Sequence, residues 1–217
     1  MKNLNKKSLV IIFTLIASLL SVGCNHGTSK SNMLLNLDGL SDDSSSEWTS
    51  LLGISTTESR ASGITSDLSG NIYTTGYTEW SLDGPPHSEG MNQFIVKYNS
   101  NGEKQWTRLL GATVSDTHAI AITSDSTGNV YTTGYTNGNL DGQTLTYNTN
   151  MFVVKYDSDG NKLWTKLRAA YGKRTYSYGI TLDSSENIYT TGNVTGSLIT
   201  GSDISFYDLF VSRFDND

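Results

Sequence analysis

A unit of 58 residues repeats without gaps along this 217-residue chain, and no other feature constrains the fold as strongly. Trp48, Trp106 and Trp164 stand one unit apart, and each is followed by a threonine. Four more positions repeat with the same spacing of 58 residues. They hold an aspartate (Asp67, Asp125 and Asp183), a tyrosine (Tyr73, Tyr131 and Tyr189), a glycine (Gly76, Gly134 and Gly192) and a phenylalanine (Phe94, Phe152 and Phe210). A fixed period over this many anchors predicts one supersecondary unit that stacks on its neighbours and buries a shared core.

Each unit predicts four short strands joined by tight turns. In the first copy these are GITSD at 63–67, NIYTTGYT at 71–78, FIVKY at 94–98 and KQWTRLLG at 104–111. Gly70 can take the positive φ of a short hairpin turn, whereas the third copy has glutamate there.

A glycine inside each second strand, at 76, 134 and 192, predicts a close backbone approach, which we expect between neighbouring sheets.

Four-stranded units repeated in this way are typical of β-propeller blades, so the chain is predicted to be all-β, with three blades in residues 47–217. The stretch GITSDLSGNIYTTGYT followed by FIVKYNSNGEKQWTRLL resembles the bacterial SBBP-type β-propeller repeat, and its strand layout is similar to that of NHL repeats. The resemblance covers nearly all of the chain after the N-terminal segment. It implies an extracellular or envelope protein and no particular reaction.

The two ends of the repeat region complement one another. Residues 47–53 are predicted as a fourth strand without its first three, and residues 210–217 stop after a third strand. Together they complete one blade, so the N-terminal strand is expected to close the last blade. Because single-chain propellers typically carry four to eight blades, we expect a homodimer that forms a six-bladed ring. A truncated descendant of a longer propeller and an open array are the alternatives.

Residues 1–23 predict an export signal. Three lysines precede a mostly apolar run at 9–20, which is too short to span a membrane as a helix. The segment LSVG before Cys24 resembles a bacterial lipobox, although its leucine stands four residues before the cysteine rather than three. The resemblance implies cleavage before Cys24 and lipidation of its thiol, with simple secretion as the alternative.

Residues 24–46 are expected to form a flexible tether whose leucine patch adds a strand or docks on the repeat domain. The predicted location is the bacterial cell envelope, with the lipid anchor in the outer membrane or at the cell surface.

Charge and cysteine content exclude several classes of partner. The formal net charge is −6, so nucleic acid is excluded as a partner. A single cysteine excludes both a disulfide framework and a cysteine-based zinc site. No cofactor is expected.

The longest and most variable loops lie at one end of the predicted blades, where ligand binding is commonly found. Candidate residues for a glycan or protein ligand are Trp80, Asp83, His87, Asp141, Tyr147, Phe206 and Tyr207. Packing of the loop aromatics onto the blades is the alternative.

The repeated acids are interpreted as structural turn residues, because each occurs identically in every unit. No catalytic residue is predicted, and His26, His87 and His118 are interpreted as scattered surface residues. Asp157 and Asp159 resemble the front half of a calcium loop, but Arg168 stands where its last carboxylate would be, which favours a hairpin turn.

The sequence therefore favours a non-enzymatic binding scaffold. The alternatives are a lyase-like or glycosidase-like enzyme with its site at the central channel, and a structural assembly module or a truncated remnant.

Overall fold

The computed structural model describes residues 34–35, 47–53, 58–82, 90–145, 148–169, 174–195 and 207–216. The chain divides into Met1–Ser31, which lies outside these ranges, and Asn32–Asp217, to which everything below belongs. The described residues contain strands and no helix, which confirms the all-β prediction. The predicted signal segment, Cys24 and most of the tether lie outside the described residues.

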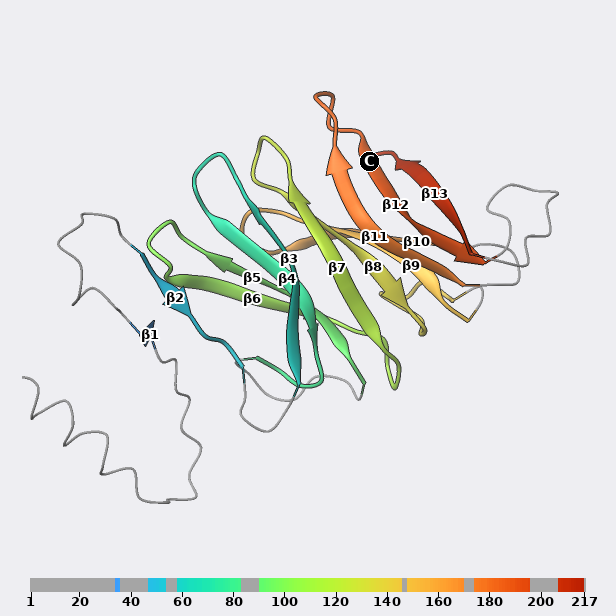
Figure 1. Cartoon of the computed structure of the whole chain (residues 1–217), viewed down its shortest axis with the longest axis horizontal. Coiled ribbons are helices and arrows are strands. Elements are labelled where there is room, and N and C mark those ends of the chain that lie inside the picture. The colour runs from blue at the N-terminus through green and yellow to red at the C-terminus, as the bar shows by residue number, and fades with distance from the viewer. Residues whose placement is uncertain are drawn as a thin grey trace, which may run out of the picture. The chain divides into compact units, whose positions relative to one another are not determined.

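Three antiparallel sheets follow the three sequence units (Figure 1). Sheet 1 consists, in spatial order, of β3 (Ser59–Ser66), β4 (Ile72–Thr78), β5 (Asn92–Tyr98) and β6 (Lys104–Leu110). Sheet 2 consists of β7 (Thr117–Ser124), β8 (Val130–Thr136), β9 (Asn150–Tyr156) and β10 (Lys162–Arg168). Sheet 3 has three strands among the described residues, which are β11 (Thr175–Leu182), β12 (Ile188–Thr195) and β13 (Tyr207–Phe214).

The core lies between successive sheets. Tyr73 and Ile95 of sheet 1 pack with Phe152 and Val154 of sheet 2. Tyr131, Met151 and Val153 of sheet 2 form the corresponding cluster with sheet 3, to which Ile188, Val194, Phe210 and Phe214 contribute. The first strands β3, β7 and β11 are neighbours, since β7 packs against both of the others. Sheet 2 therefore has one face toward sheet 1 and the other toward sheet 3.

The glycine inside each second strand has a different cause from the one expected. A methyl group on Gly134 would overlap the carbonyl oxygen of His118 in β7, where the pairing of β7 with β8 shifts at a bulge between Ala119 and Ala121. Gly76 and Gly192 stand in the same way against β3 and β11. The close approach thus lies between two strands of one sheet and not between sheets, because the bulge pushes backbone toward the neighbouring strand.

A fourth, two-stranded sheet joins β1 (Leu34–Leu35) to β2 (Thr49–Ser50). Leu34 and Leu35 of the leucine patch thus form a short strand, and the rest of the patch lies outside the described residues. Trp48, next to β2, packs on sheet 1, with its ring 6.0 Å from that of Tyr98. Among the described residues β13 has no fourth-strand neighbour, so the expected closure of the last blade by residues 47–53 is not found within the single chain.

Candidate functional site

The repeated acids lie in the turns between the first and second strands of each sheet. Asp67 Oδ1 accepts hydrogen bonds from the backbone N–H groups of Ser69 and Asn71, both at 2.9 Å. Its Oδ2 accepts from Asn71 Nδ2 at 2.8 Å and from the Tyr73 hydroxyl at 2.9 Å. The same contacts recur around the acids of the other two turns, Asp125 and Asp183.

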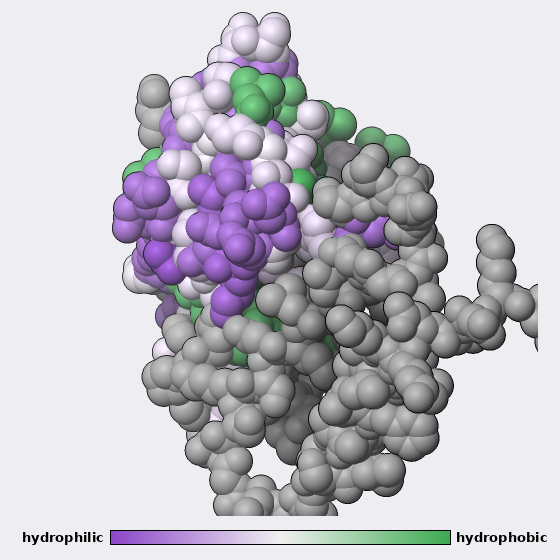
Figure 2. All heavy atoms as spheres, turned by 90° about the vertical axis from the view of Figure 1, so that its left-hand side faces the viewer, coloured by the Kyte–Doolittle hydropathy of each residue, from purple (hydrophilic) through white to green (hydrophobic). Residues whose placement is uncertain are grey.

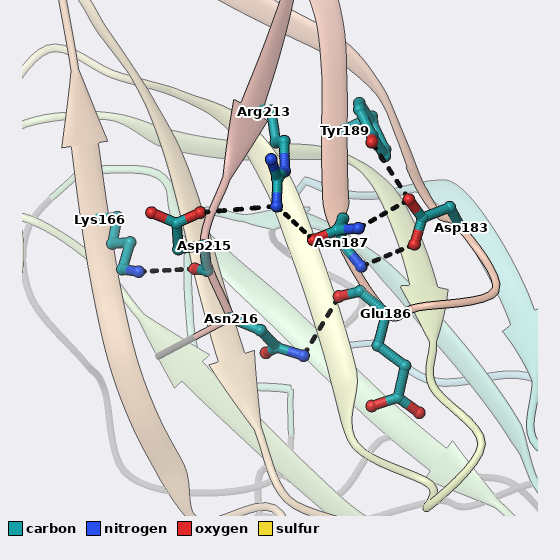
Figure 3. Close-up of polar contacts among 8 residues, drawn as sticks. All are labelled: Lys166, Asp183, Glu186, Asn187, Tyr189, Arg213, Asp215 and Asn216. Atoms are coloured by element: carbon teal, nitrogen blue, oxygen red, sulfur yellow. Dashed lines mark hydrogen bonds and ion pairs between the residues drawn. The ribbon is translucent and has the colours of Figure 1, made fainter.

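These contacts leave the carboxylates little capacity for chemistry. Burial by itself would raise the pKa of Asp67, but the hydrogen bonds from Asn71 and Tyr73 outweigh it and hold the pKa below its ordinary value. Figure 3 shows the third turn, with Asp183 directed at Asn187 and Tyr189. The arrangement is that of an Asx turn locked by a tyrosine.

The calcium-like segment is also a hairpin turn in its geometry. Asp157 Oδ1 accepts the N–H groups of Asp159 at 3.0 Å and Asn161 at 2.8 Å, and its Oδ2 accepts Asn161 Nδ2 at 2.8 Å. Among the described residues, no three histidine, cysteine or acidic side chains come together in a way that could hold a metal ion.

The structure describes three of the seven candidate loop residues. Trp80 follows β4 and is exposed, Tyr207 opens β13 and is exposed, and Asp141 forms an ion pair with Lys162 of β10. The other four, Asp83, His87, Tyr147 and Phe206, lie outside the described residues.

A row of aromatic rings crosses all three sheets, and the sequence interpretation missed it. We define the row as Tyr77 of β4, His118 of β7, Tyr135 of β8, and Tyr176 and Tyr178 of β11. Successive ring centroids are 4.1, 5.0, 4.9 and 6.3 Å apart. The first and third of these contacts join neighbouring sheets, so the row is continuous only because the sheets pack side by side.

The row lies at the end of the sheets from which the long loops leave. Tyr77 is the second-last residue of β4, after which the chain enters the loop that holds Trp80. His118 and Tyr176 are each the second residue of a first strand, which begins at the same end. The row therefore lies beside the bases of the variable loops.

All rings of the row whose pKa is shifted are held in their neutral form. Burial lowers the pKa of His118 more than the nearby acids Asp116 and Glu58 raise it. Burial, followed by the neighbouring tyrosines, raises the pKa of Tyr135, and burial also raises that of Tyr178. Flat, neutral, half-buried rings with polar edges suit stacking on the apolar faces of sugars or on side chains of a protein partner.

Two signals in the sequence could have revealed the row. Tyr77 and Tyr135 are the last tyrosines of the repeated NIYTTGYT motif, and His118 and Tyr176 share one position of the first strand. The register pairs these two positions directly, as in His118 with Tyr135. The sequence predicts His118 as a scattered surface residue, whereas the structure places its half-buried imidazole between the rings of Tyr77 and Tyr135.

Within the residues that the structure describes, no helix is long and apolar enough to cross a membrane.

Comparison with known proteins identifies the repeat. Residues 47–79, 105–141 and 163–199 match the SBBP family model, which describes a beta-propeller repeat. The chain is also similar to an uncharacterized WD repeat-containing protein, L264, of Acanthamoeba polyphaga mimivirus, with 32% identity over 43% of this chain and 8% of that protein. This chain therefore spans less than a tenth of that relative's length. The matches agree with the all-β architecture, and the chain carries three β-propeller repeats of this kind.

Proposed function

We propose that this chain is a non-enzymatic binding protein of the bacterial cell envelope and that its aromatic row holds a glycan. The observation that carries the proposal is the row itself, in which five rings from three sheets follow one another beside the variable loops, with successive centroids 4.1 to 6.3 Å apart. Aromatic rings bind sugars through the apolar C–H faces of the pyranose ring, while tyrosine hydroxyls and an imidazole supply hydrogen bonds at the edges.

Charge narrows the class of glycan. The chain carries a formal net charge of −6, and Glu58 and Asp116 lie near His118 in the row. A polyanionic glycan would be repelled by this field, so a neutral sugar chain is the ligand that fits best.

The location rests on residues 1–24. The basic start, the short apolar run and Cys24 support export followed by lipidation, which would tether the acidic repeat domain to a membrane. The outer membrane or the cell surface is the proposed site, where neutral polysaccharides are within reach.

Binding is tested on an array of neutral oligosaccharides, followed by calorimetry with the strongest binder. Tyr178→Ala is the diagnostic variant, because Tyr178 is the most exposed ring of the row and its removal leaves the sheet core intact. We expect binding to weaken by at least about threefold. Leu163→Ala is the matched control, because Leu163 is an exposed apolar residue of β10 outside the row.

Two results would contradict the proposal. One is an array without any binder above background. The other is equal weakening by Tyr178→Ala and Leu163→Ala. Release of shortened sugars from the bound glycan would instead favour the glycosidase-like alternative.

A further inference from the structure

The contact between successive sheets is built twice from equivalent residues. Lys97 Nζ of sheet 1 donates to the carbonyl oxygen of Ser158 in sheet 2 at 2.8 Å. Its equivalent Lys155 of sheet 2 donates to Asn216 Oδ1 in sheet 3 at 2.9 Å. Ser158 and Asn216 are themselves one repeat apart. The chain thus contains two copies of one sheet-to-sheet interface.

Sheet 1 exposes the half of this interface that faces a preceding sheet. Ile64 is 72% exposed, whereas its equivalent Ile122 in sheet 2 is 8% exposed beneath sheet 1. Ile72 is half-buried, while its equivalents Val130 and Ile188 are fully buried. A hollow of about 340 Å³ lies on this face, and its apolar lining includes Trp48, Leu51, Ile64, Ile72, Phe94 and Val96.

Figure 2 looks at the side on which β2 lies in Figure 1. The described residues there present hydrophobic areas in green beside a hydrophilic patch in purple. Ile64, whose equivalent Ile122 in sheet 2 is buried, is at the surface on sheet 1.

Sheet 3 exposes the opposite half of the interface. Leu209 and Val211 of β13 are 80% and 70% exposed, whereas their equivalents in sheet 2, Met151 and Val153, are fully buried by sheet 3. Arg213 stands where Lys97 and Lys155 stand in the other sheets. With no following sheet among the described residues, it bonds to Asn187 of its own sheet at 2.6 Å (Figure 3).

We infer that these two faces bind each other in a second copy of this chain, head to tail. The occupant follows from the repeat. The exposed face of sheet 3 is equivalent to the face of sheet 1 that packs against sheet 2 and to the face of sheet 2 that packs against sheet 3. The exposed face of sheet 1 is equivalent to the opposite faces of sheets 2 and 3, which form the other side of those two contacts. Two copies joined at both ends bring six sheets together, a number within the range in which β-propellers close.

A strand position supports the same partner. Trp48 lies over Gly102 of sheet 1, as Trp106 of β6 lies over Gly160 of sheet 2. Residues 47–53 therefore occupy the place of the fourth strand of a sheet that precedes sheet 1. In the docked pair this segment is the missing fourth strand beside β13 of the other copy.

The internal register fixes which residues would pair. Thr165 of β10 pairs with Val154 of β9, and Thr107 of β6 pairs with Val96 of β5. Thr49 is the repeat equivalent of Thr107 and Thr165, and Ser212 is the equivalent of Val96 and Val154. The same register therefore places Thr49 of one copy opposite Ser212 of the other. β1 pairs with only two residues of β2, so the eight-residue β13 offers the longer partner.

The first experiment measures the mass of the full 217-residue chain by sedimentation equilibrium in a density-matched detergent. We expect a species of twice the 23.6 kDa chain mass. Val211→Glu is expected to give single chains that keep their fold, because residue 211 is at the surface of the single chain. Leu163→Glu is the matched control, which changes an exposed leucine of β10 away from both end faces and is expected to leave the two-chain species intact.

A single-chain species for the unchanged protein up to high concentration would overturn the inference. A two-chain species that persists in Val211→Glu would also overturn it, as would an open series of larger sizes.

The second experiment reads the register directly. Chains with Thr49→Cys are mixed with chains carrying Ser212→Cys under oxidising conditions, and the unchanged chain, which keeps Cys24, is the blank. We expect a disulfide between the two variants, because paired strand residues lie within disulfide reach. Ser126→Cys, in an exposed turn of sheet 2, replaces Ser212→Cys as the control and is expected to give no link. Equal yields from both mixtures, or no link from either, would overturn the head-to-tail docking.

Discussion

The imidazole of His118 lies flat on the ring of Tyr135, with the two centroids 5.0 Å apart and the two planes 8° from parallel. The two residues are cross-strand partners in β7 and β8, and Tyr77 of sheet 1 contacts the same imidazole at 4.1 Å. A charged imidazole would lose part of its hydration between these rings, so the packing favours the neutral form.

This packing predicts a loss of stability in mild acid. The pKa of His118 in the folded chain lies below its ordinary value of 6.5, because burial lowers it more than Asp116 and Glu58 raise it. As the pH falls below 6.5, the unfolded chain takes up a proton that the folded chain does not yet bind. The stabilisation is complete above 6.5 and is lost as the pH falls toward the folded-state pKa.

Urea unfolding at pH 7.5 and at pH 5 measures the effect, with His118→Phe as the comparison, since phenylalanine keeps a ring in the row and does not titrate. We expect the free energy of unfolding to fall more between the two pH values in the unchanged chain than in the variant. His26 and His87 are present in both proteins, so the difference reports His118. Equal falls would contradict the prediction.

Gly134→Ala is expected to destabilise the chain by about 3 kcal/mol, since the added methyl group overlaps the backbone of His118 and the two strands must separate. Gly179→Ala is the control. The added carbon there would lie 3.1 Å from a methyl group of Thr191, which can shift. Chemical denaturation of both variants gives the comparison, and a loss no greater than that of the control would argue against the bulge contact.

Glu186→Gly is expected to stabilise the chain by up to about 1 kcal/mol. Glu186 has a φ of 62°, in the left-handed region, where the equivalent Gly70 and Gly128 have φ of 79° and 87°. The change also removes a 2.5 Å hydrogen bond from the Ser126 hydroxyl to the glutamate carboxylate, an exposed contact of little net value.

Glu186→Ala separates the two effects, because alanine removes the same carboxylate but keeps the backbone strain. Thermal unfolding is expected to rank the variants glycine above alanine. Alanine above glycine would contradict the backbone strain at this turn, and an unfolding temperature of Glu186→Gly below that of the unchanged chain would mean that the lost side-chain contact outweighs the relieved strain.

Cys24→Ser is expected to release the exported protein from the membrane fraction and to abolish incorporation of labelled fatty acid. The reason is that each buried acyl methylene contributes about 0.8 kcal/mol to membrane affinity. Without the acyl chains, the acidic repeat domain has no attraction to a negatively charged membrane surface. Detergent phase partitioning of the two proteins is the measurement. Labelling that persists in the serine variant would show that the lipid is elsewhere.

Local features were predictable from the sequence because their cause is local. The strand segments follow from the repeat, and the turn at Asp67 follows from an acid, an asparagine and a tyrosine at fixed spacing. Gly134 predicts a close backbone approach, which is correct, but its neighbour is β7 of the same sheet and not another sheet, since a bulge in β7 leaves no trace in the repeat pattern.

The aromatic row was not predictable in the same way. Tyr77 and His118 belong to different columns of the repeat and meet only because sheet 1 packs on sheet 2. The position of residues 47–53 was equally hidden, because the sequence shows that this segment is a fourth strand but not on which sheet it lies.

The turns around the three acids also bear on mutation. Each turn is held by the carboxylate of its acid, through bonds to the backbone and side chain of the asparagine four residues on and to the tyrosine six residues on. The three residues in between contribute little beyond a backbone conformation that reverses the chain direction. They are LSG, STG and SSE in the three turns. Substitutions are therefore tolerated at the first two of these positions. A library randomised at 68–69 should yield many folded chains and one randomised at Asp67, Asn71 and Tyr73 very few.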